Sequence, residues 1–257
     1  MNYSPCTYQF SGVSTSVASY SKIPLKTLEQ ILSIRKLAFI DRKKWDIESY
    51  QGSDYEWDEY DDPDAIYIYA HTHDRVTGCV RLRPSNKPTL MSGSLSFILP
   101  TDKPRPCLQH CWEATRFALS TDSFATGELT QANVDIRTAA LFLSMIKFAQ
   151  QQNIHTYEIV VDTMMEKILK RSGWTVERRN IALGSKGEKI IYGTLPCTFT
   201  TYEEVLSKNA IKTTRLYNPS PETCRSSDAH HKPLDIGQTF RNRNISAKSS
   251  MHTELQL

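Results

Sequence analysis

Apolar and polar residues alternate with helical or strand periods through the middle of this 257-residue chain. Residues 25–39 and 138–151 place apolar side chains every three to four positions, which is typical of amphipathic helices. Residues 64–72 and 75–84 are strand-like and are joined by a short polar turn, which predicts a β-hairpin. This order of elements predicts a mixed α/β sandwich around one sheet. Further strands are expected at 112–119, 156–162 and 189–195, and a further helix at 164–173, where Gly173 ends it.

Both ends of the chain lack a helical or strand period. Residues 209–257 are rich in Ser, Asn, Thr and Pro, and the first residues have a similarly irregular character. We therefore expect one folded domain at 22–208, a flexible N-terminal extension at 1–21 and a largely disordered, basic C-terminal tail at 209–257. No internal repeat is visible.

The excess positive charge lies in the tail. Residues 210–257 hold seven of the 31 Lys and Arg and four of the 28 Asp and Glu, which leaves 24 of each sign in the rest of the chain. A neutral body argues against a dedicated nucleic-acid binder, which normally has a concentrated basic face.

Compartment and metal content are inferred from what the sequence lacks. It has no run of about 18 apolar residues, so we expect no membrane span. Its first residues have neither the basic start nor the apolar stretch of a signal peptide. The six cysteines are scattered without a CxxC pair, which favours reduced thiols over a disulfide or metal framework. We therefore expect a bacterial cytoplasmic protein without a metal site.

Arg35 interrupts an apolar helix face. It shares this face with Leu28, Leu32 and Phe39, where an unpaired guanidinium would be costly to bury. Two interpretations stay open: the side chain reaches the surface, or it meets an acid or a ligand inside the protein.

The stretch 46–64 is strongly acidic, with nine Asp and Glu and no Lys or Arg. Most runs of this kind are solvated loops. Here, however, large aromatic residues stand in and beside the stretch, and acids with aromatics also suit a lid over a cationic ligand. These aromatic residues are Trp45, Tyr55, Trp57 and Tyr60.

Two further strands carry charges among apolar residues. Alternation places Arg81 on the opposite face from Val80 and Leu82. Glu113 and Arg116 would fall on opposite faces of their strand unless it bulges between them, and bulges are common beside active sites. Arginines and acids against apolar segments favour a buried polar pocket over a plain core.

The order of these residues resembles the acyl-homoserine-lactone synthases, the LuxI-type autoinducer synthases of quorum-sensing bacteria. The segments RKLAFIDRKKW, YEWDEYD, GCVRLRP and WEATRF are similar to the family motifs, and MMEKILKRSGW resembles the family's C-terminal half. Thr115 stands where the family usually has Ser, so a hydroxyl remains on a stiffer side chain. The matching positions are Arg35, Phe39, Trp45, Asp58, Asp61, Arg81, Glu113 and Arg116.

The resemblance implies an acetyltransferase-like fold: a three-layer αβα sandwich around a mixed, mainly antiparallel sheet with a bulged central strand. It implies that an acyl group from acyl carrier protein is joined to S-adenosylmethionine as an amide, and that lactonisation then releases methylthioadenosine. S-adenosylmethionine is thus a substrate, and no cofactor is expected to stay bound. The oligomeric state stays open.

The resemblance also assigns roles to residues. Glu113 and Arg116 are the expected catalytic pair. Lys167, Lys170 and Arg171 form a basic cluster that could meet the acidic carrier protein, although basic residues at a helix end are also ordinary. Arg35 either contacts substrate or only organises the pocket. The residues expected to bind S-adenosylmethionine and to organise its pocket are Arg35, Phe39, Trp45, Asp58, Asp61, Arg81 and Thr115.

Two other functions remain as alternatives. An acyl-CoA-dependent N-acyltransferase of the same fold would need a glycine-rich turn at a helix start to hold the CoA pyrophosphate, and VDIRTAALFLSM contains no glycine. A non-catalytic ligand-binding module would keep its ligand after loss of Glu113.

Overall fold

The computed structural model describes residues 6–102, 104–122 and 128–213. The strands are β1 (Cys6–Phe10), β2 (Val13–Ser19), β3 (Ile66–Thr72), β4 (Arg75–Pro84), β5 (Cys111–Leu119), β6 (Thr156–Asp162), β7 (Glu177–Leu183) and β8 (Lys189–Pro196). The helices are α1 (Leu25–Arg35), α2 (Ile136–Gln151), α3 (Thr163–Ser172) and α4 (Phe199–Lys208), with a π-helix η1 (Lys36–Arg42) and a 3-10 turn η2 (Ser96–Ile98).

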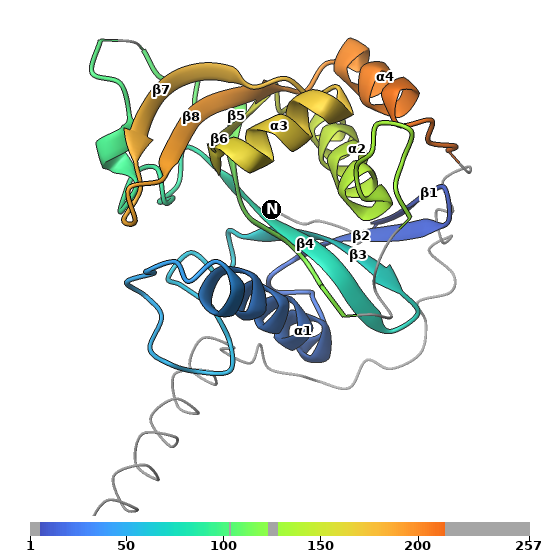
Figure 1. Cartoon of the computed structure of the whole chain (residues 1–257), viewed down its shortest axis with the longest axis horizontal. Coiled ribbons are helices and arrows are strands. Elements are labelled where there is room, and N and C mark those ends of the chain that lie inside the picture. Colours follow the sequence, from blue (N-terminus) through green and yellow to red (C-terminus); the bar gives the residue numbers. More distant parts are fainter. Residues whose placement is uncertain (1–5, 103, 123–127, 214–257) are drawn as a thin grey trace, which may run out of the picture.

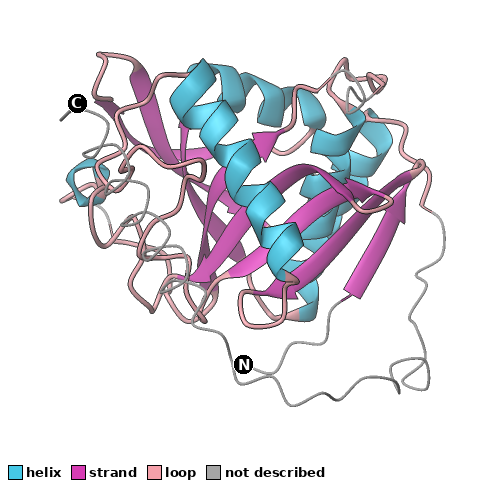
Figure 2. Ribbon diagram, turned by 90° about the horizontal axis from the view of Figure 1, so that it is seen from below, coloured by secondary structure: helices cyan, strands magenta, loops and turns pink. Residues whose placement is uncertain are grey.

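The strands form one sheet in the order β1-β2-β3-β4-β5-β6-β8-β7. Only β5 and β6 pair in parallel among the described strands; every other neighbouring pair is antiparallel. Helix α1 covers one face of the sheet, and α2, α3 and α4 lie on the other (Figure 1). Figure 2 looks onto the face that α1 covers. The predicted three-layer αβα sandwich around a mixed, mainly antiparallel sheet is confirmed.

The predicted hairpin and the later elements agree with the structure. Strands β3 and β4 pair antiparallel over Ile66–Thr72 and Arg75–Pro84. Helix α2 buries its predicted stripe against the sheet, where Leu141 and Phe148 have no exposed surface. Helix α3 ends at Gly173, whose φ of +93° is a left-handed conformation that favours glycine.

The expectation of a flexible extension at 1–21 is wrong for residues 6–19. They form β1 and β2, and Tyr8 and Phe10 enter the main core beneath α2. The Ser and Thr residues that gave this segment a loop-like composition instead make specific side-chain hydrogen bonds. Thr7 Oγ1 and Ser16 Oγ share one across β1 and β2 at 3.0 Å, and Thr15 Oγ1 and Ser144 Oγ share one between β2 and α2 at 2.6 Å. Small β-branched and hydroxyl side chains suit a paired strand, so composition was misleading here.

The folded domain also extends past the predicted boundary at 208. Asn209 and Ile211 are buried, and Thr213 forms a bridge with Phe10. The rest of the predicted C-terminal tail, 214–257, lies outside the described residues.

The helix predicted at 25–39 changes character at its end. The α-helical pattern of α1 stops at Arg35, and the chain continues as the π-helix η1. Lys44 then has a φ of +54°, and the Trp45 amide donates to the Phe39 carbonyl at 2.8 Å. This tight return places Trp45 beside Phe39. π-helical turns are rare and occur frequently at functional sites.

Strand β5 creates a gap in the sheet. It pairs with β6 only over Cys111–Glu113 and Thr156–Glu158, after which the two strands diverge. On its other side, its register with β4 shifts between Thr115 and Ala118, so two residues of β5 stand opposite one of β4. The expected bulge in the central strand is therefore present, directly beside the gap.

In the part of the chain that the structure describes, no helix is both long and apolar enough to cross a membrane.

Candidate active site

Three arginines and three acids form a closed ring beside β5, which we call the ionic ring. Each arginine contacts two acids and each acid contacts two arginines, so every charge has opposite charges as neighbours. Five members have less than a tenth of their surface exposed, and the sixth, Arg116, exposes 12% of its side chain. In ring order the members are Arg35, Glu56, Arg116, Asp58, Arg81 and Asp61.

Arg35 is held inside this ring. Its Nη1 and Nη2 donate to the two carboxylate oxygens of Asp61 at 2.8 and 2.9 Å, and its Nε donates to Glu56 at 2.6 Å. A bidentate pair of this kind fixes geometry as well as charge. Arg35 has no exposed surface and is absent from the cavity wall described below. The ionic ring therefore encloses the Arg35 side chain away from the cavity wall.

Arg81 is placed similarly. Its guanidinium donates to both oxygens of Asp58, at 2.5 and 3.0 Å, and to Asp61 at 2.9 Å. The Arg81 Nε is buried and has no hydrogen-bond partner among the described residues. Tyr67 donates its hydroxyl to Asp61 at 2.6 Å, which completes the shell around that carboxylate.

Arg116 closes the ring at the bulge of β5. Its Nε and Nη2 donate to Glu56 at 3.1 Å and Asp58 at 2.7 Å, and its φ is +58°. A non-glycine residue held in the left-handed region is strained, and such residues cluster at functional sites. Because Arg116 and Asp58 also line the cavity, they are the members that a ligand can reach.

The arginines of the ring keep Asp58 and Asp61 ionised. Burial alone would raise the pKa of Asp61, but the charges of Arg35 and Arg81 hold it well below its usual range. Burial acts on Asp58 in the same way, and Arg81 and Arg116 together lower its pKa. The ring therefore carries both signs of charge at neutral pH.

Glu113 lies apart from the ring. Its carboxylate accepts the Met91 amide at 2.7 Å and the Leu90 amide at 3.3 Å. Burial raises the pKa of Glu113 above its ordinary value, although these amides and the Arg81 charge act in the opposite direction. Glu113 has no exposed surface and does not line the cavity, whereas Leu90 does.

Thr115 lies between Glu113 and Arg116 in β5, and its hydroxyl has no hydrogen-bond partner among the described residues. Its Oγ1 is buried, and the residue lines the cavity. An unpaired buried hydroxyl is costly, so it marks a place where a ligand could supply the missing partner.

Phe39 and Trp45 form an aromatic wall. Their rings stack with centroids 5.3 Å apart and planes 1° apart. The Arg116 guanidinium lies 5.9 Å from the Phe39 ring, and the Lys43 ammonium lies 4.7 Å from the Trp45 ring. Both contacts are within cation–π range.

A cavity of about 1180 Å³ connects the ring and the aromatic wall to the apolar interior. Its wall includes residues from η1 on one face of the sheet and from α2 on the other, so it passes through the gap between β5 and β6. The polar part has acids and cations in its wall: Asp46, Glu48, Asp58, Glu59, Arg42, Lys43 and Arg116. The apolar part has Phe142, Met145, Ile159, Ile168, Leu169 and Trp174.

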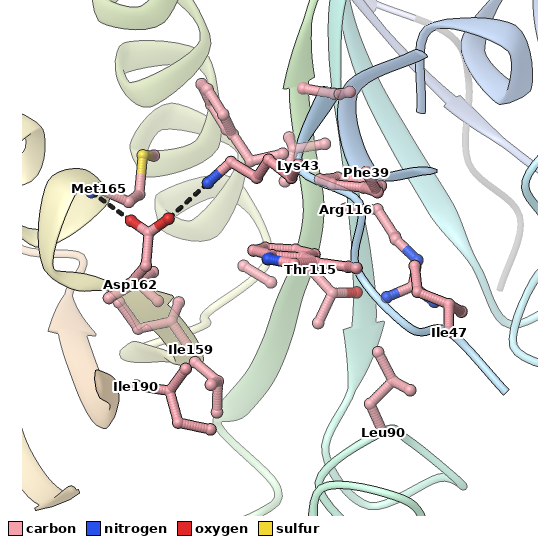
Figure 3. A pocket seen from close by; sticks show the side chains of 18 of the residues that line it. Phe39, Lys43, Ile47, Leu90, Thr115, Arg116, Ile159, Asp162, Met165 and Ile190 are labelled. Carbon is pink, nitrogen blue, oxygen red and sulfur yellow. Dashed lines mark hydrogen bonds and ion pairs between the residues drawn. The ribbon is translucent and has the colours of Figure 1, made fainter. Parts of the chain in front are cut away.

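Figure 3 shows the two sides of this cavity facing each other. An ion pair between Lys43 and Asp162 crosses between them, and the other oxygen of Asp162 accepts the Met165 amide at 2.7 Å. Ile159, Asp162, Met165 and Ile190 lie on one side, and Phe39, Ile47, Leu90 and Arg116 on the other.

The predicted basic cluster lies on α3. Lys167, Lys170 and Arg171 are exposed, and Arg171 donates to the Asn133 carbonyl at 3.1 Å. Lys167 and Lys170 therefore lie on the protein surface.

Two functional features were missed from the sequence. Glu56 is the ring member that links Arg35 to Arg116, but it is one of nine acids in a single stretch. The Lys43–Asp162 ion pair joins residues 119 positions apart, which no local pattern could reveal. Across residues 6–102, 104–122 and 128–213, no group of three or more His, Cys, Asp or Glu side chains could hold a metal ion.

Comparisons with known proteins agree with one another. The model of the family described as Autoinducer synthase matches residues 20–205. An acyl-homoserine-lactone synthase of Vibrio anguillarum is 29% identical over 161 residues, which cover 62% of this chain and 80% of that protein. An acyl-homoserine-lactone synthase of Pseudomonas amygdali pv. tabaci is 26% identical over 202 residues, which cover 79% of this chain and 86% of that protein.

Solved structures show the same fold. The crystal structure of the AHL synthase LasI matches with a TM-score of 0.65 at 23% identity, covering 77% of this chain and 96% of that one. The CoA-dependent acyl-homoserine lactone synthase BjaI, solved with SAM and isopentyl-CoA, matches with a TM-score of 0.62 at 19% identity, covering 80% of this chain and 90% of that one.

Proposed function

The chain belongs to the autoinducer synthase family, and from this membership we propose that it makes an N-acyl-homoserine lactone from S-adenosylmethionine and an acyl-acyl carrier protein. The observation that supports this most strongly is the single cavity with two unlike ends. One end offers acids, arginines, a lysine and aromatic rings, and the other is mainly apolar, with both meeting at the bulge of β5.

S-adenosylmethionine occupies the polar end in this proposal. Its sulfonium and ammonium groups are cations, which suit the Phe39–Trp45 wall and the neighbouring acids. Its carboxylate suits Arg116, whose Nε and Nη2 are engaged by Glu56 and Asp58 while Nη1 remains for a ligand. Arg35, Asp61 and Arg81 organise this end from within the ionic ring.

The acyl chain occupies the apolar end. The residues that α2 and α3 contribute there, such as Phe142, Met145 and Leu169, bury hydrocarbon at about 25 cal/mol per Å². The thioester then lies in the gap between β5 and β6, next to Thr115 and the bulge.

In the first chemical step the methionyl amine attacks the thioester carbon. A C–N bond forms, the C–S bond breaks, and the carrier leaves as a thiol. An α-amino group has a pKa of about 8, so a weak base is sufficient to accept its proton. We assign that base to Glu113, acting through a water molecule because its carboxylate does not line the cavity. Backbone N–H groups released by the bulge, with the Thr115 hydroxyl, stabilise the oxyanion.

In the second step the carboxylate oxygen attacks the γ-carbon of the same molecule. The C–O bond closes the lactone, and the bond from that carbon to the sulfonium breaks, which releases methylthioadenosine. Arg116 contributes by holding the carboxylate in line with the γ-carbon, a positioning effect.

The carrier protein is the preferred donor for two reasons. The exposed basic residues of α3 complement an acidic carrier. In addition, the N-terminus of α2, which a CoA-dependent acyltransferase would use for pyrophosphate, is capped by the Asp135 carboxylate through the Arg137 amide at 2.9 Å. This carboxylate also pairs with the Arg137 guanidinium at 2.6 Å, so the Arg137 amide at the helix start already has a partner and does not await a pyrophosphate.

The test is an incubation of the full chain with S-adenosylmethionine and acyl carrier proteins of graded acyl length, beside matched acyl-CoA thioesters. Mass spectrometry then follows acyl-homoserine lactone and methylthioadenosine. Both products from an acyl carrier protein support the proposal. If only acyl-CoA gives products, the proposed reaction stands and the proposed acyl donor is wrong. If no donor gives lactone, the proposed function is wrong.

A further inference from the structure

A series of aromatic and ionic contacts between side chains starts at the bulge of β5. The Arg116 guanidinium lies against the Phe39 ring, which stacks on Trp45, and the Lys43 ammonium lies 4.7 Å from the other aromatic ring of this pair. Lys43 follows directly on η1, so the same short segment supplies both the wall and the ammonium.

This series of contacts continues across the cavity. Lys43 forms an ion pair with Asp162, the residue that ends β6 and caps α3 (Figure 3). The side chains of Lys43 and Asp162 are 31% and 19% exposed, so water screens the pair only in part. Lys186, in the turn between β7 and β8, adds a second tie by donating to the Lys43 carbonyl at 3.0 Å.

Asp162 is well suited to receive this contact. Although burial would raise its pKa, the Lys43 ammonium and the Met165 amide lower it, so the carboxylate is ionised. One of its oxygens accepts from Lys43 and the other accepts the Met165 amide at 2.7 Å. The ion pair is therefore anchored to the first turn of α3, the helix that carries the exposed basic residues.

We propose that Lys43 and Asp162 act together as positioning residues, holding the Phe39–Trp45 wall against α3 so that the two substrates meet in register across the gap between β5 and β6. This inference rests on the proposed function, because it assigns one substrate to each side of the gap. Neither side chain takes part in bond making.

The physical argument is that these two sides have few other direct ties. Strands β5 and β6 share only three residue pairs before they diverge. Without the ion pair, the η1 end can move relative to α3, while the ring stack that binds one substrate stays intact. Misplacement of the reacting groups by about 1 Å can lower the reaction rate up to a hundredfold. The affinity for each substrate should change much less, because each binding surface stays intact.

The test compares K43M, D162N and the double variant with the wild type at saturating substrates. Asn keeps an acceptor at the start of α3, so D162N removes the charge and preserves the cap. We expect each single variant to lower kcat about tenfold and to change KM for S-adenosylmethionine less than threefold. The double variant should be no worse than either single one, because both substitutions remove the same contact.

Two controls separate positioning from general damage. K43R keeps the charge and should stay within about threefold of wild-type kcat. K44M removes the neighbouring exposed lysine, which does not line the cavity, and should leave kcat unchanged. Thermal unfolding of every variant shows whether the fold is retained.

A further readout is the ratio of free fatty acid to lactone. Misaligned substrates leave the thioester open to water, which forms the acid and the thiol, so the ratio should rise in K43M and D162N. Two results would overturn the positioning role. One is a loss of kcat in the double variant that equals the product of the two single losses, and the other is a kcat within twofold of wild type in both single variants. A wild-type protein that makes neither lactone nor methylthioadenosine would instead overturn the proposed function.

Discussion

Glu113 and Arg116 lie on the same strand, but the bulge at Arg116 gives their side chains separate partners. Glu113 accepts the Met91 amide at 2.7 Å. Arg116 instead contacts Glu56 and Asp58. The carboxylate and the guanidinium of β5 therefore have different partners. Arg116 lines the cavity, whereas Glu113 lies behind it and contacts the amide of the lining residue Leu90.

The first prediction concerns the proposed base. E113Q keeps the size of the side chain and removes its ability to accept a proton, so kcat should fall by about a hundredfold or more. The wild-type rate should fall as the pH drops through the raised pKa of Glu113, because protonation removes the base. Steady-state kinetics across pH, with thermal unfolding as control, provides the check. An E113Q enzyme with near-normal kcat and a lower Tm would make Glu113 purely structural.

The second prediction concerns Arg116. R116K retains a charge but cannot engage Glu56, Asp58 and a substrate carboxylate with one planar group, so affinity for S-adenosylmethionine should fall about tenfold. Isothermal titration of the free protein measures this directly. Unchanged affinity would mean that the substrate carboxylate binds elsewhere.

The third prediction tests the ionic ring. D61N leaves Arg35 and Arg81 without one carboxylate, and loss of a buried partner should destabilise the fold by about 3–5 kcal/mol. Because the folded-state pKa of Asp61 is lowered, its stabilisation is present above the unfolded-state pKa and is lost as the pH falls toward the folded-state value. Urea unfolding near neutral and at acid pH should therefore show a weaker acid dependence in D61N. The exposed Asp64 supplies a control, D64N, which should match the wild type.

The fourth prediction uses the unpaired hydroxyl of Thr115. T115V replaces the hydroxyl with a methyl group of similar size, so stability should be unchanged or rise by about 1 kcal/mol. If the hydroxyl stabilises the oxyanion, kcat should nevertheless fall at least tenfold, an effect comparable to loss of a weak oxyanion donor. If T115V has the stability and the kcat of the wild type, the Thr115 hydroxyl has no part in the mechanism.

The fifth prediction concerns docking of the carrier. The double variant K167E/K170E should lower kcat/KM for acyl-acyl carrier protein about tenfold, and the loss should shrink as salt is added. K26E, on α1 at the opposite face of the sheet, has the same sign of change and should have little effect. Equal losses in both variants would point to net charge rather than to a docking surface.

The sequence was informative wherever a charge broke an apolar period. Arg35 and Arg81 stood out for that reason, and both are buried in the ring. The spacing of Glu113 and Arg116 required a bulge only if both serve one site, whereas the resemblance implied a bulged central strand, and the structure places the bulge at Arg116 and Phe117. By contrast, β1 and β2 were hidden because their Ser and Thr residues resemble a loop in composition, while the packing of Tyr8 and Phe10 decides their structure.

Site details that depend on tertiary contacts could not be predicted. Alternation along a strand does not say that Glu113 turns toward the Leu90–Met91 backbone, because that segment lies 22 positions earlier in the chain. Nor does a run of acids say which one is fully enclosed. Glu56 has no exposed surface only because Arg35 and Arg116 approach it from two separate elements.

The closure of the ionic ring has a consequence for how this protein can evolve. Three positive and three negative groups balance, and each group touches two of the opposite sign. A single substitution leaves two buried neighbours with one opposite charge each instead of two and unbalances the ring by one charge, so intermediates on a path of stepwise change are less stable. We therefore expect the six residues to tolerate replacement poorly one at a time, whereas at the apolar end of the cavity one side chain can change without its neighbours.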